Sequence, residues 1–236
     1  MADMFLEGRL ALVTGASRGI GAATAEALAA AGAHVILTAR SADALEEVED
    51  RIHEAGGNAT IAPLDLTESD SIARLAAAIS GRWDALDVMV LNAATLGSLT
   101  PVAAIDGKEF NRVLTLNVLA NQALIAGFDP LLRRSAAGRL LAVTSSVGAH
   151  PRAYWGAYGA SKAALETLVL SYADEVRNIS PVRVAIVDPG ATATTMRARA
   201  FPGEDAATLK PPSAVAEAIA ALLRRDFDSG ERLVVR

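Results

Sequence analysis

The sequence predicts an α/β protein built as one doubly wound domain, with about seven parallel strands and helices on both faces of the sheet. Short apolar runs alternate along the chain with longer alanine-rich segments of helical spacing, which is typical of parallel strands joined by right-handed helical crossovers. Apolar residues make up 52% of the chain and aromatic residues only 4%. This composition suits a sheet of small aliphatic side chains that is buried on both faces.

The predicted elements follow one another in a regular order. Buried strands are expected at the apolar runs that begin at Arg9, His34, Ala59, Leu86, Arg139, Val182 and Arg232. Helices are expected over residues 21–31, 42–55, 69–82, 107–134, 157–178 and 213–225. Because no repeat or Gly/Ser/Pro-rich linker divides the chain, residues 1–236 are expected to form a single domain. The one irregular stretch, residues 191–212, predicts a loop that covers a substrate site.

Composition and charge exclude several classes of protein. The chain has no cysteine, which rules out disulfides, a thiolate nucleophile and cysteine-ligated metals. Its three histidines are scattered, so no metal site is predicted. A net charge of −5 argues against a general nucleic-acid binder. The start of the chain lacks a signal-peptide pattern, and no apolar run reaches the roughly 18 residues of a membrane helix, which predicts a cytoplasmic protein with no membrane partner.

The stretch LVTGASRGIG predicts a phosphate-binding loop. Its first part also matches the G-x-S-x-G nucleophile elbow of hydrolases, but only 14 residues precede Gly15, too few for the upstream oxyanion loop. After a strand and before a helix, a glycine-rich turn presents free amides and the positive end of the helix dipole to a pyrophosphate. Gly15 permits the turn, Gly19 lets the backbone approach the ligand, and Gly21 allows close packing of helix on strand.

The end of the second strand indicates which dinucleotide binds. NAD-preferring sites place a carboxylate there for the ribose 2′-hydroxyl, whereas an arginine pairs with the 2′-phosphate of NADP. The sequence has Ala39 and Arg40 at this point, and Arg18 lies within the glycine loop. We therefore expect NADP(H) to be preferred over NAD(H), although two solvated arginines would give the same pattern.

A second motif predicts acid–base chemistry. Tyr158 and Lys162 lie four residues apart, so on a helix they share one face. A nearby ammonium and a positively charged nicotinamide would lower the pKa of the phenol toward the working pH. Ser145 follows the fifth strand, where its hydroxyl can hydrogen-bond a substrate oxygen. A Tyr and a Lys at this spacing also occur by chance, so the pair alone is weak evidence.

Together these motifs resemble the short-chain dehydrogenase/reductase family over nearly the whole chain. The similar features are TGASRGIG, Asp65 after the third strand, Asn92-Ala93-Ala94 after the fourth, a helical Asn117, Ser145, Tyr158-x-x-x-Lys162, and Pro189-Gly190 with Thr194 beyond. Ser145 lies thirteen residues before Tyr158, which favours it over Ser146. The resemblance implies a single NAD(P)-binding Rossmann domain and an oxidoreductase that acts on CH–OH groups.

The resemblance also implies a role for each matching residue. Tyr158 is expected to be the acid or base, with Lys162 lowering its pKa and binding the nicotinamide ribose, Ser145 orienting the substrate carbonyl, and Asn117 holding a water that links Lys162 to solvent. Cofactor contacts are implied for Gly15, Ser17, Arg18, Gly19, Ile20, Gly21, Arg40, Asp65, Leu66, Asn92, Ala93, Lys162, Pro189, Gly190, Thr192 and Thr194. An apolar substrate wall is expected from Thr95, Leu96, Tyr154, Trp155 and Met196, and His150 lies close enough in sequence to join it.

Two departures and several alternatives accompany the resemblance. Ala94 stands where the family usually has glycine, and its added methyl can shift the backbone beside the cofactor or narrow the site. The chain also stops soon after its last strand, which leaves less material for a wall of the substrate site or for subunit contacts. The leading expectation is NADP(H)-dependent interconversion of a carbonyl and an alcohol. A 3-oxoacyl-[acyl-carrier-protein] reductase, docking through Arg133 and Arg134 or Arg197 and Arg199, is the alternative enzyme. A nucleotide-sensing scaffold without catalysis is the alternative from another class. The long helices carry small and apolar residues on more than their inward face, and the resemblance implies that such helices pair between subunits in a homodimer or homotetramer. The excess of alanine can also reflect composition alone.

Overall fold

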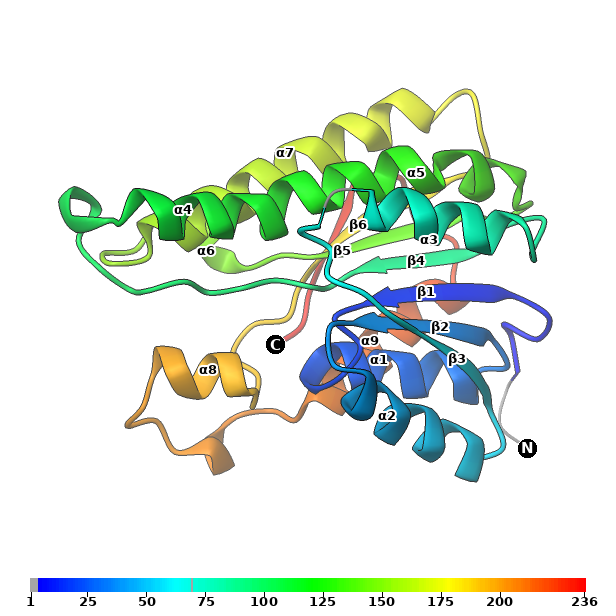
Figure 1. Ribbon diagram of the computed structural model, residues 1–236, viewed down its shortest axis with the longest axis horizontal. Coiled ribbons are helices and arrows are strands. Elements are labelled where there is room, and N and C mark those ends of the chain that lie inside the picture. Colours follow the sequence, from blue (N-terminus) through cyan, green and yellow to red (C-terminus); the bar gives the residue numbers. More distant parts are fainter. Residues whose placement is uncertain (1–3, 69) are drawn as a thin grey trace.

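The computed structural model describes residues 4–68 and 70–236, and it contains one seven-stranded parallel sheet (Figure 1). The strand order is β3-β2-β1-β4-β5-β6-β7. The strands are β1 (Leu10–Thr14), β2 (His34–Ala39), β3 (Asn58–Pro63), β4 (Val88–Leu91), β5 (Arg139–Val143), β6 (Arg183–Asp188) and β7 (Glu231–Val234). The order reverses between β1 and β4, which is where ligands bind in doubly wound sheets. The predicted fold class is confirmed.

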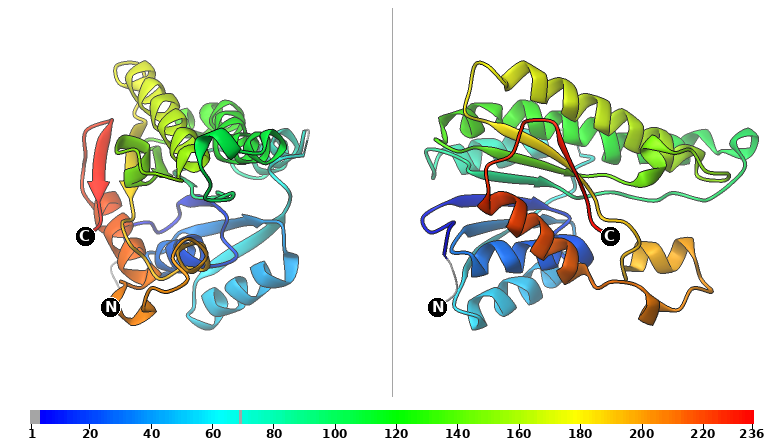
Figure 2. Two further views of the ribbon diagram at one scale, coloured as in Figure 1. Left: turned by 90° about the vertical axis from the view of Figure 1, so that its left-hand side faces the viewer. Right: turned by 180° about the vertical axis from the view of Figure 1, so that it is seen from behind.

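Helices cover both faces of this sheet (Figures 1 and 2). One layer holds α1 (Gly19–Ala30), α2 (Ala42–Glu54) and α9 (Pro212–Arg224), and the other holds α3 (Ser71–Ser80), α5 (Ala120–Arg134) and α7 (Gly156–Val176). Short helices α4 (Gly107–Leu114), α6 (Ser146–Ala149) and α8 (Thr195–Ala200) lie toward the side where the strands end. Ser69, the expected first residue of the third helix, lies outside the described residues.

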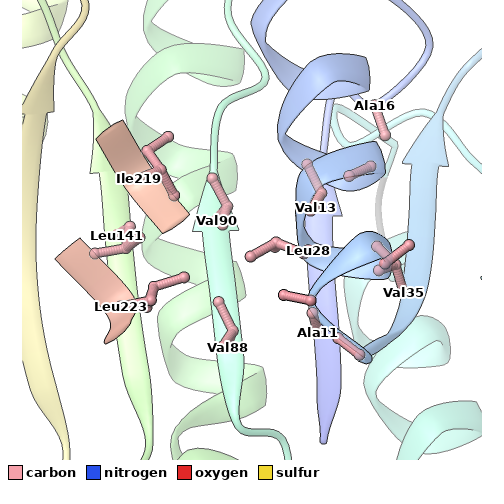
Figure 3. Close-up of a cluster of buried hydrophobic side chains, with 14 of the residues drawn as sticks. Ala11, Val13, Ala16, Leu28, Val35, Val88, Val90, Leu141, Ile219 and Leu223 are labelled. Carbon is pink, nitrogen blue, oxygen red and sulfur yellow. The ribbon is translucent and has the colours of Figure 1, made fainter. Parts of the chain in front are cut away.

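Each face of the sheet has its own apolar core, because successive residues of a strand point to opposite faces. On the first face, Val13 and Val90 meet Leu28 of α1 and Ile219 of α9 (Figure 3). On the second face, Leu12 belongs to a cluster with side chains of α3, α5 and α7. With both faces covered, the whole of β1 is buried, and the carboxyl ends of the strands form a rigid edge for a site.

One expected helix differs from the structure. The predicted helix over residues 107–134 is interrupted, because Thr115–Leu119 forms a π-helical turn between α4 and α5. Asn117 lies in this wide turn and is fully buried. Its side-chain carbonyl accepts a hydrogen bond from Thr95 N (2.8 Å), and its Nδ2 donates to Thr95 O (2.9 Å) and to Ser161 Oγ (3.0 Å). The π-turn thus turns a polar side chain inward, as such turns often do at functional sites.

The irregular stretch over residues 191–212 folds as an excursion beyond β6. It contains α8 and the 3-10 turn Ala206–Thr208, and it is tied back by a bridge between Thr192 and Lys210. Figure 1 shows α8 displaced from the sheet on the side of the strand ends. Within the described part of the chain, no helix combines the length and the apolar character needed to cross a membrane.

Candidate active site

A cavity of about 830 Å³ lies at the carboxyl ends of the central strands. One end of it is lined by the glycine loop, Arg40 and Asp65, and the other by Ser145, Tyr158 and residues of α8. Fifteen of the expected contacts line it together: Gly15, Ser17, Arg18, Gly19, Ile20, Arg40, Asp65, Leu66, Asn92, Ala93, Lys162, Pro189, Gly190, Thr192 and Thr194. The cavity therefore joins the two motifs that the sequence places more than a hundred residues apart.

The three glycines of the loop are not all required for the same reason. A Cβ on Gly15, which has a φ of +65°, would lie 2.9 Å from Ala93 Cα. A Cβ on Gly21 would lie 2.2 Å from Gly15 O, so α1 packs directly on the loop. Gly19 has a φ of +57° but would meet only Thr194 at 3.5 Å, which leaves its cavity side open. Gly15 and Gly21 are therefore required by packing, and Gly19 by conformation and ligand approach.

The start of α1 is suited to a phosphate. No side chain caps this helix, and no acidic residue occurs in its first turn. Its first amides therefore face the cavity without a side-chain acceptor, and the helix dipole adds positive potential there. The exposed side chains of Arg18 and Arg40 line the same end. These features fit the pyrophosphate and 2′-phosphate of a dinucleotide.

Asn92 fixes the glycine loop to β4. Its Nδ2 donates to Thr14 O (3.0 Å) and to Gly15 O (3.2 Å), and its backbone N–H donates to Thr14 Oγ1 (2.9 Å). Ala94, the departure from the family pattern, lines the cavity beside it. Asn92 thus supports the cofactor loop from behind by satisfying its buried carbonyls.

Asp65 lies at the far end of the cavity, where its conformation is set by a local turn. Its carboxylate accepts hydrogen bonds from Thr67 Oγ1 (2.6 Å) and Thr67 N (2.8 Å). These bonds lower the pKa of Asp65 below its ordinary value, with the charge of Arg40 a smaller contribution in the same direction. The carboxylate is therefore a fixed hydrogen-bond acceptor beside Leu66.

The expected catalytic residues come together at the other end. Ser145 follows β5 as the N-cap of α6, while Tyr158 and Lys162 lie in the first turns of α7. Lys162 Nζ lies 5.6 Å from the centroid of the Tyr158 ring and donates to Val143 O (2.9 Å). Both side chains are almost completely buried. This geometry confirms the expected helix, its phase and the close approach of the two side chains.

Electrostatics at this end differ from the expectation. Burial raises the pKa of Tyr158 above its ordinary value, and the charge of Asp188 adds to the increase. Burial also lowers the pKa of Lys162 to about 8, although the charge of Glu166 acts in the opposite direction. In the protein without nucleotide, burial therefore outweighs the effect of Lys162 on the pKa of the phenol. Lowering the pKa of the phenol requires a further positive charge, such as an oxidised nicotinamide.

An aromatic and cationic stack connects α8 to the catalytic helix. The Trp155 ring centroid lies 6.0 Å from that of Tyr158 and 5.6 Å from that of Phe201. Arg152 lies 5.0 Å and Arg197 3.8 Å from the Phe201 ring centroid. Trp155 and Met196 line the cavity together with Arg112, Arg197 and Arg199, so its substrate end carries both apolar and cationic surface.

Four expected residues lie away from the cavity. Tyr154, expected in the substrate wall, is 59% exposed with a φ of +71° and does not line it; this prediction is corrected, because the backbone turns there before α7 begins. His150 is exposed and also does not line it. Gly21 and Asn117 lie behind the lining and act through packing and hydrogen bonds.

Several lining residues were missed. They are Ala39, Ser41, Leu64, Thr67, Arg112, Thr115, Leu116, Val143, Thr144, Thr195, Arg197, Arg199 and Ala200. Most flank a predicted site residue, so proximity in sequence could have found them. Arg112 of α4 could not be found this way, because no predicted site residue lies next to it in the sequence.

The fold and the cavity define a dinucleotide-dependent oxidoreductase. The family model of the short-chain dehydrogenases matches residues 9–205. The chain belongs to this family, and its family activity is oxidation or reduction at CH–OH groups with NAD(P).

Individual proteins agree with this assignment. The chain is 40% identical over 211 residues to an uncharacterized oxidoreductase, YciK, of Escherichia coli (strain K12), covering 88% of this chain and 83% of that protein. It is 38% identical to the rhamnolipids biosynthesis 3-oxoacyl-[acyl-carrier-protein] reductase of Pseudomonas aeruginosa, covering 78% of this chain and 73% of that protein. It superposes on a short-chain dehydrogenase of Shigella flexneri in complex with NADP with a TM-score of 0.94, at 37% identity, covering 100% of this chain and 99% of the other.

Proposed function

We propose that the protein is an NADP(H)-dependent oxidoreductase that interconverts a ketone or aldehyde and an alcohol, with Tyr158 as the acid or base. The observation that supports this most strongly is the shared cavity, in which Ser145, Tyr158 and Lys162 lie at one end and the uncapped start of α1 at the other. One cavity can therefore hold a dinucleotide and a small substrate together.

Each side chain has a distinct task in this proposal. The bound nicotinamide supplies or accepts the hydride. Tyr158 O–H donates its proton to the substrate oxygen in reduction, and its raised pKa keeps the proton on the phenol until then. Ser145 Oγ–H donates a hydrogen bond to the same oxygen, and the Lys162 ammonium stabilises the phenolate that forms. Asn117, through the turn that it fixes, is proposed to hold a water between Lys162 and solvent.

The proposed preference for NADP(H) depends on the two arginines. Arg18 and Arg40 line the ribose end, and no carboxylate follows β2 there. The next residue, Ser41, uses its hydroxyl to accept from Ala44 N at the start of α2. An adenosine 2′-phosphate would therefore meet two guanidinium groups and no carboxylate directly after β2.

Titration calorimetry tests the cofactor, and a substrate screen tests the reaction. Nucleotide-free protein is titrated with NADPH and NADH, and we expect tighter binding of NADPH. Aliphatic, cyclic and aromatic ketones and aldehydes are then followed by the loss of NADPH absorbance. Tighter binding of NADH would reject the cofactor preference, and NADPH binding without turnover across the screen would reject the proposed reaction.

A second candidate is reduction of a 3-oxoacyl thioester on an acyl carrier protein, supported by the identity to the Pseudomonas aeruginosa reductase. The basic patches that such a carrier would need are largely engaged. Arg133 pairs with Asp129, Arg134 Nε donates to Asp84 O, and Arg197 pairs with Glu204. We therefore place this candidate second. Turnover of an acetoacetyl thioester with NADPH would move it to first place.

We also propose a cytoplasmic homodimer or homotetramer. Leu119, next to α5, and Leu170 on α7 are 60% and 36% exposed, so the two long helices present apolar surface outward. Pairing these surfaces between subunits would remove them from water. Light scattering tests the assembly, and a monomeric mass would reject it.

A further inference from the structure

Glu166 is a buried carboxylate that the proposed reaction does not use. It lies one helical turn beyond Lys162 on α7, and only 8% of the residue is exposed. Arg232 of β7 donates to both of its oxygens, from Nη1 to Oε1 (3.0 Å) and from Nη2 to Oε2 (2.5 Å). Burial alone would raise the pKa of Glu166, but the hydrogen bonds from Arg232 and Thr144 outweigh it and lower the pKa. Glu166 is therefore a fixed negative charge beside the catalytic end of the cavity.

The same carboxylate binds the residue before Ser145 and lies beside the segment after it. Thr144, the residue before Ser145, donates from Oγ1 to Glu166 Oε1 (2.5 Å). After Ser145, α6 packs so closely on α7 that a Cβ on Gly148 would lie 3.3 Å from Glu166 Oε1. Gly148 N also donates to Ser145 O (3.0 Å). Ser145 is thus held between two segments that meet at one carboxylate.

Glu166 is also the acidic group that favours the charged form of Lys162. The charged and titratable groups around Lys162 are Tyr158 and Glu166 on α7, Asp188 at the end of β6, and Arg232 on β7. With Lys162 and Arg232 protonated and Glu166 and Asp188 ionised, the cluster is neutral. Removing the charge of Glu166 would leave the buried Lys162 without this favourable partner while Arg232 stays charged, which disfavours the Lys162 ammonium.

We propose that Glu166, clamped by Arg232, is a positioning residue of the active site that holds Ser145 through Thr144 and Gly148 and balances the charge of Lys162. The kinetic part of this proposal rests on the proposed function. The clamp also explains why the last strand matters to the site: Arg232 reaches α7 because β7 pairs in register with β6, with Arg232 opposite Ile186.

The first experiment compares two matched variants. Glu166→Gln keeps the size of the side chain and its acceptor for Thr144 but removes the charge. The control is Glu231→Gln. It removes the charge of the residue next to Arg232 on β7, which forms an exposed ion pair with Arg225. The chain has three lysines, Lys108, Lys162 and Lys210, so ¹³C-lysine NMR follows each side chain separately.

The lysine titration measures the pKa of Lys162, which would not change if Glu166 had a purely structural role. In the wild type and in Glu231→Gln, the Lys162 signal is expected to titrate near pH 8. In Glu166→Gln its midpoint is expected about one pH unit lower, because the favourable charge is lost. An unchanged Lys162 midpoint in folded Glu166→Gln would overturn the charge-balancing part of the proposal.

Hydrogen exchange and kinetics test the hold on Ser145. Amides of residues 144–149 are expected to exchange faster in Glu166→Gln than in Glu231→Gln. If the wild type reduces a carbonyl, kcat is expected to fall about tenfold in Glu166→Gln with little change in the NADPH dissociation constant, since small misplacements of reacting groups cost up to about a hundredfold. Unchanged exchange and unchanged kcat would overturn the positioning role.

A second pair of variants covers the case in which Glu166→Gln does not fold. Thr144→Val removes one donor to Glu166 with little change in shape, and Thr144→Ser restores the hydroxyl. We expect Thr144→Val to loosen residues 144–149 and lower kcat, and Thr144→Ser to recover both. Equal exchange rates and equal kcat in Thr144→Val and Thr144→Ser would show that the hydrogen bond from Thr144 to Glu166 does not position Ser145. Because NMR and exchange need no turnover, a failure of the proposed reaction is distinguishable from a failure of this proposal.

Discussion

The two ends of the cavity are built in different ways. At the nucleotide end, the ligand meets backbone: glycines at positive φ, uncapped amides of α1, and two exposed arginines. At the catalytic end, it meets buried side chains of β5 and α7, which other buried side chains hold in place. The glycine loop of the first end is encoded by consecutive residues, and Arg40 and Asp65 join it from the ends of the next two strands. The second end depends on side chains from β5, α7 and β7, which are far apart in the chain. Substitutions at the first end should therefore change binding and packing, and substitutions at the second should change chemistry.

The largest expected effect is at the catalytic end. Tyr158→Phe removes the proton donor and little volume, so kcat should fall about 10²- to 10⁴-fold while NADPH binding stays near its wild-type value. Steady-state kinetics and calorimetry measure the two quantities. Tyr154→Phe is the matched control, because Tyr154 is exposed outside the cavity and should keep full activity. A strong loss of NADPH affinity in Tyr158→Phe would contradict the division between the two ends.

At the nucleotide end, the largest expected effect is one of packing. In Gly21→Ala, the new Cβ would lie 2.2 Å from Gly15 O and 2.5 Å from Asn92 Nδ2, so the loop must move. We expect a loss of about 3 kcal/mol in the free energy of unfolding, together with weaker NADPH binding. Gly107→Ala is the control, since nothing lies within 4 Å of a Cβ at the start of α4. Urea unfolding of both variants checks the difference, and equal stability would mean that α1 does not depend on this contact.

The same contrast explains what could be predicted from the sequence. The glycine loop, Arg18 and Arg40 form one local pattern, and the helical spacing of Tyr158 and Lys162 is local too. Glu166 gave no such signal, because its importance depends on Arg232, 66 residues later, and on the pairing of β7 with β6. The π-turn at Asn117 was also missed, because a single wide turn within a long helical segment has no distinctive local residue pattern. Tyr154 was misplaced because its position depends on a backbone turn with positive φ.

A smaller effect is expected from the arginines that line the ribose end. Arg40→Ala should raise the NADPH dissociation constant about tenfold, because a charge-assisted hydrogen bond to phosphate contributes about 1.5 to 3 kcal/mol at most sites. NADH, which lacks the 2′-phosphate, should bind almost as before and is the internal control. Calorimetry with both nucleotides measures the two constants. A parallel loss for NADH and NADPH would indicate a general effect of Arg40 on the loop and would remove the basis for the cofactor preference.

The last prediction concerns stability and tests whether burial sets the pKa of Lys162 without any ligand. The pKa of Lys162 is lowered in the fold to about 8 from an ordinary value of 10.5, so between these values the unfolded chain binds more protons than the folded one. The free energy of unfolding should therefore rise as the pH increases from 8 to 10. Above pH 10 the raised pKa of Tyr158 acts in the opposite direction, so the test is confined to pH 8–10. Relative to Lys162→Met, the wild type should gain about 1 kcal/mol per pH unit in urea unfolding. Parallel pH profiles for the two proteins would mean that Lys162 is solvated in the free enzyme, and that its environment at this end is created by the ligand and not by the fold.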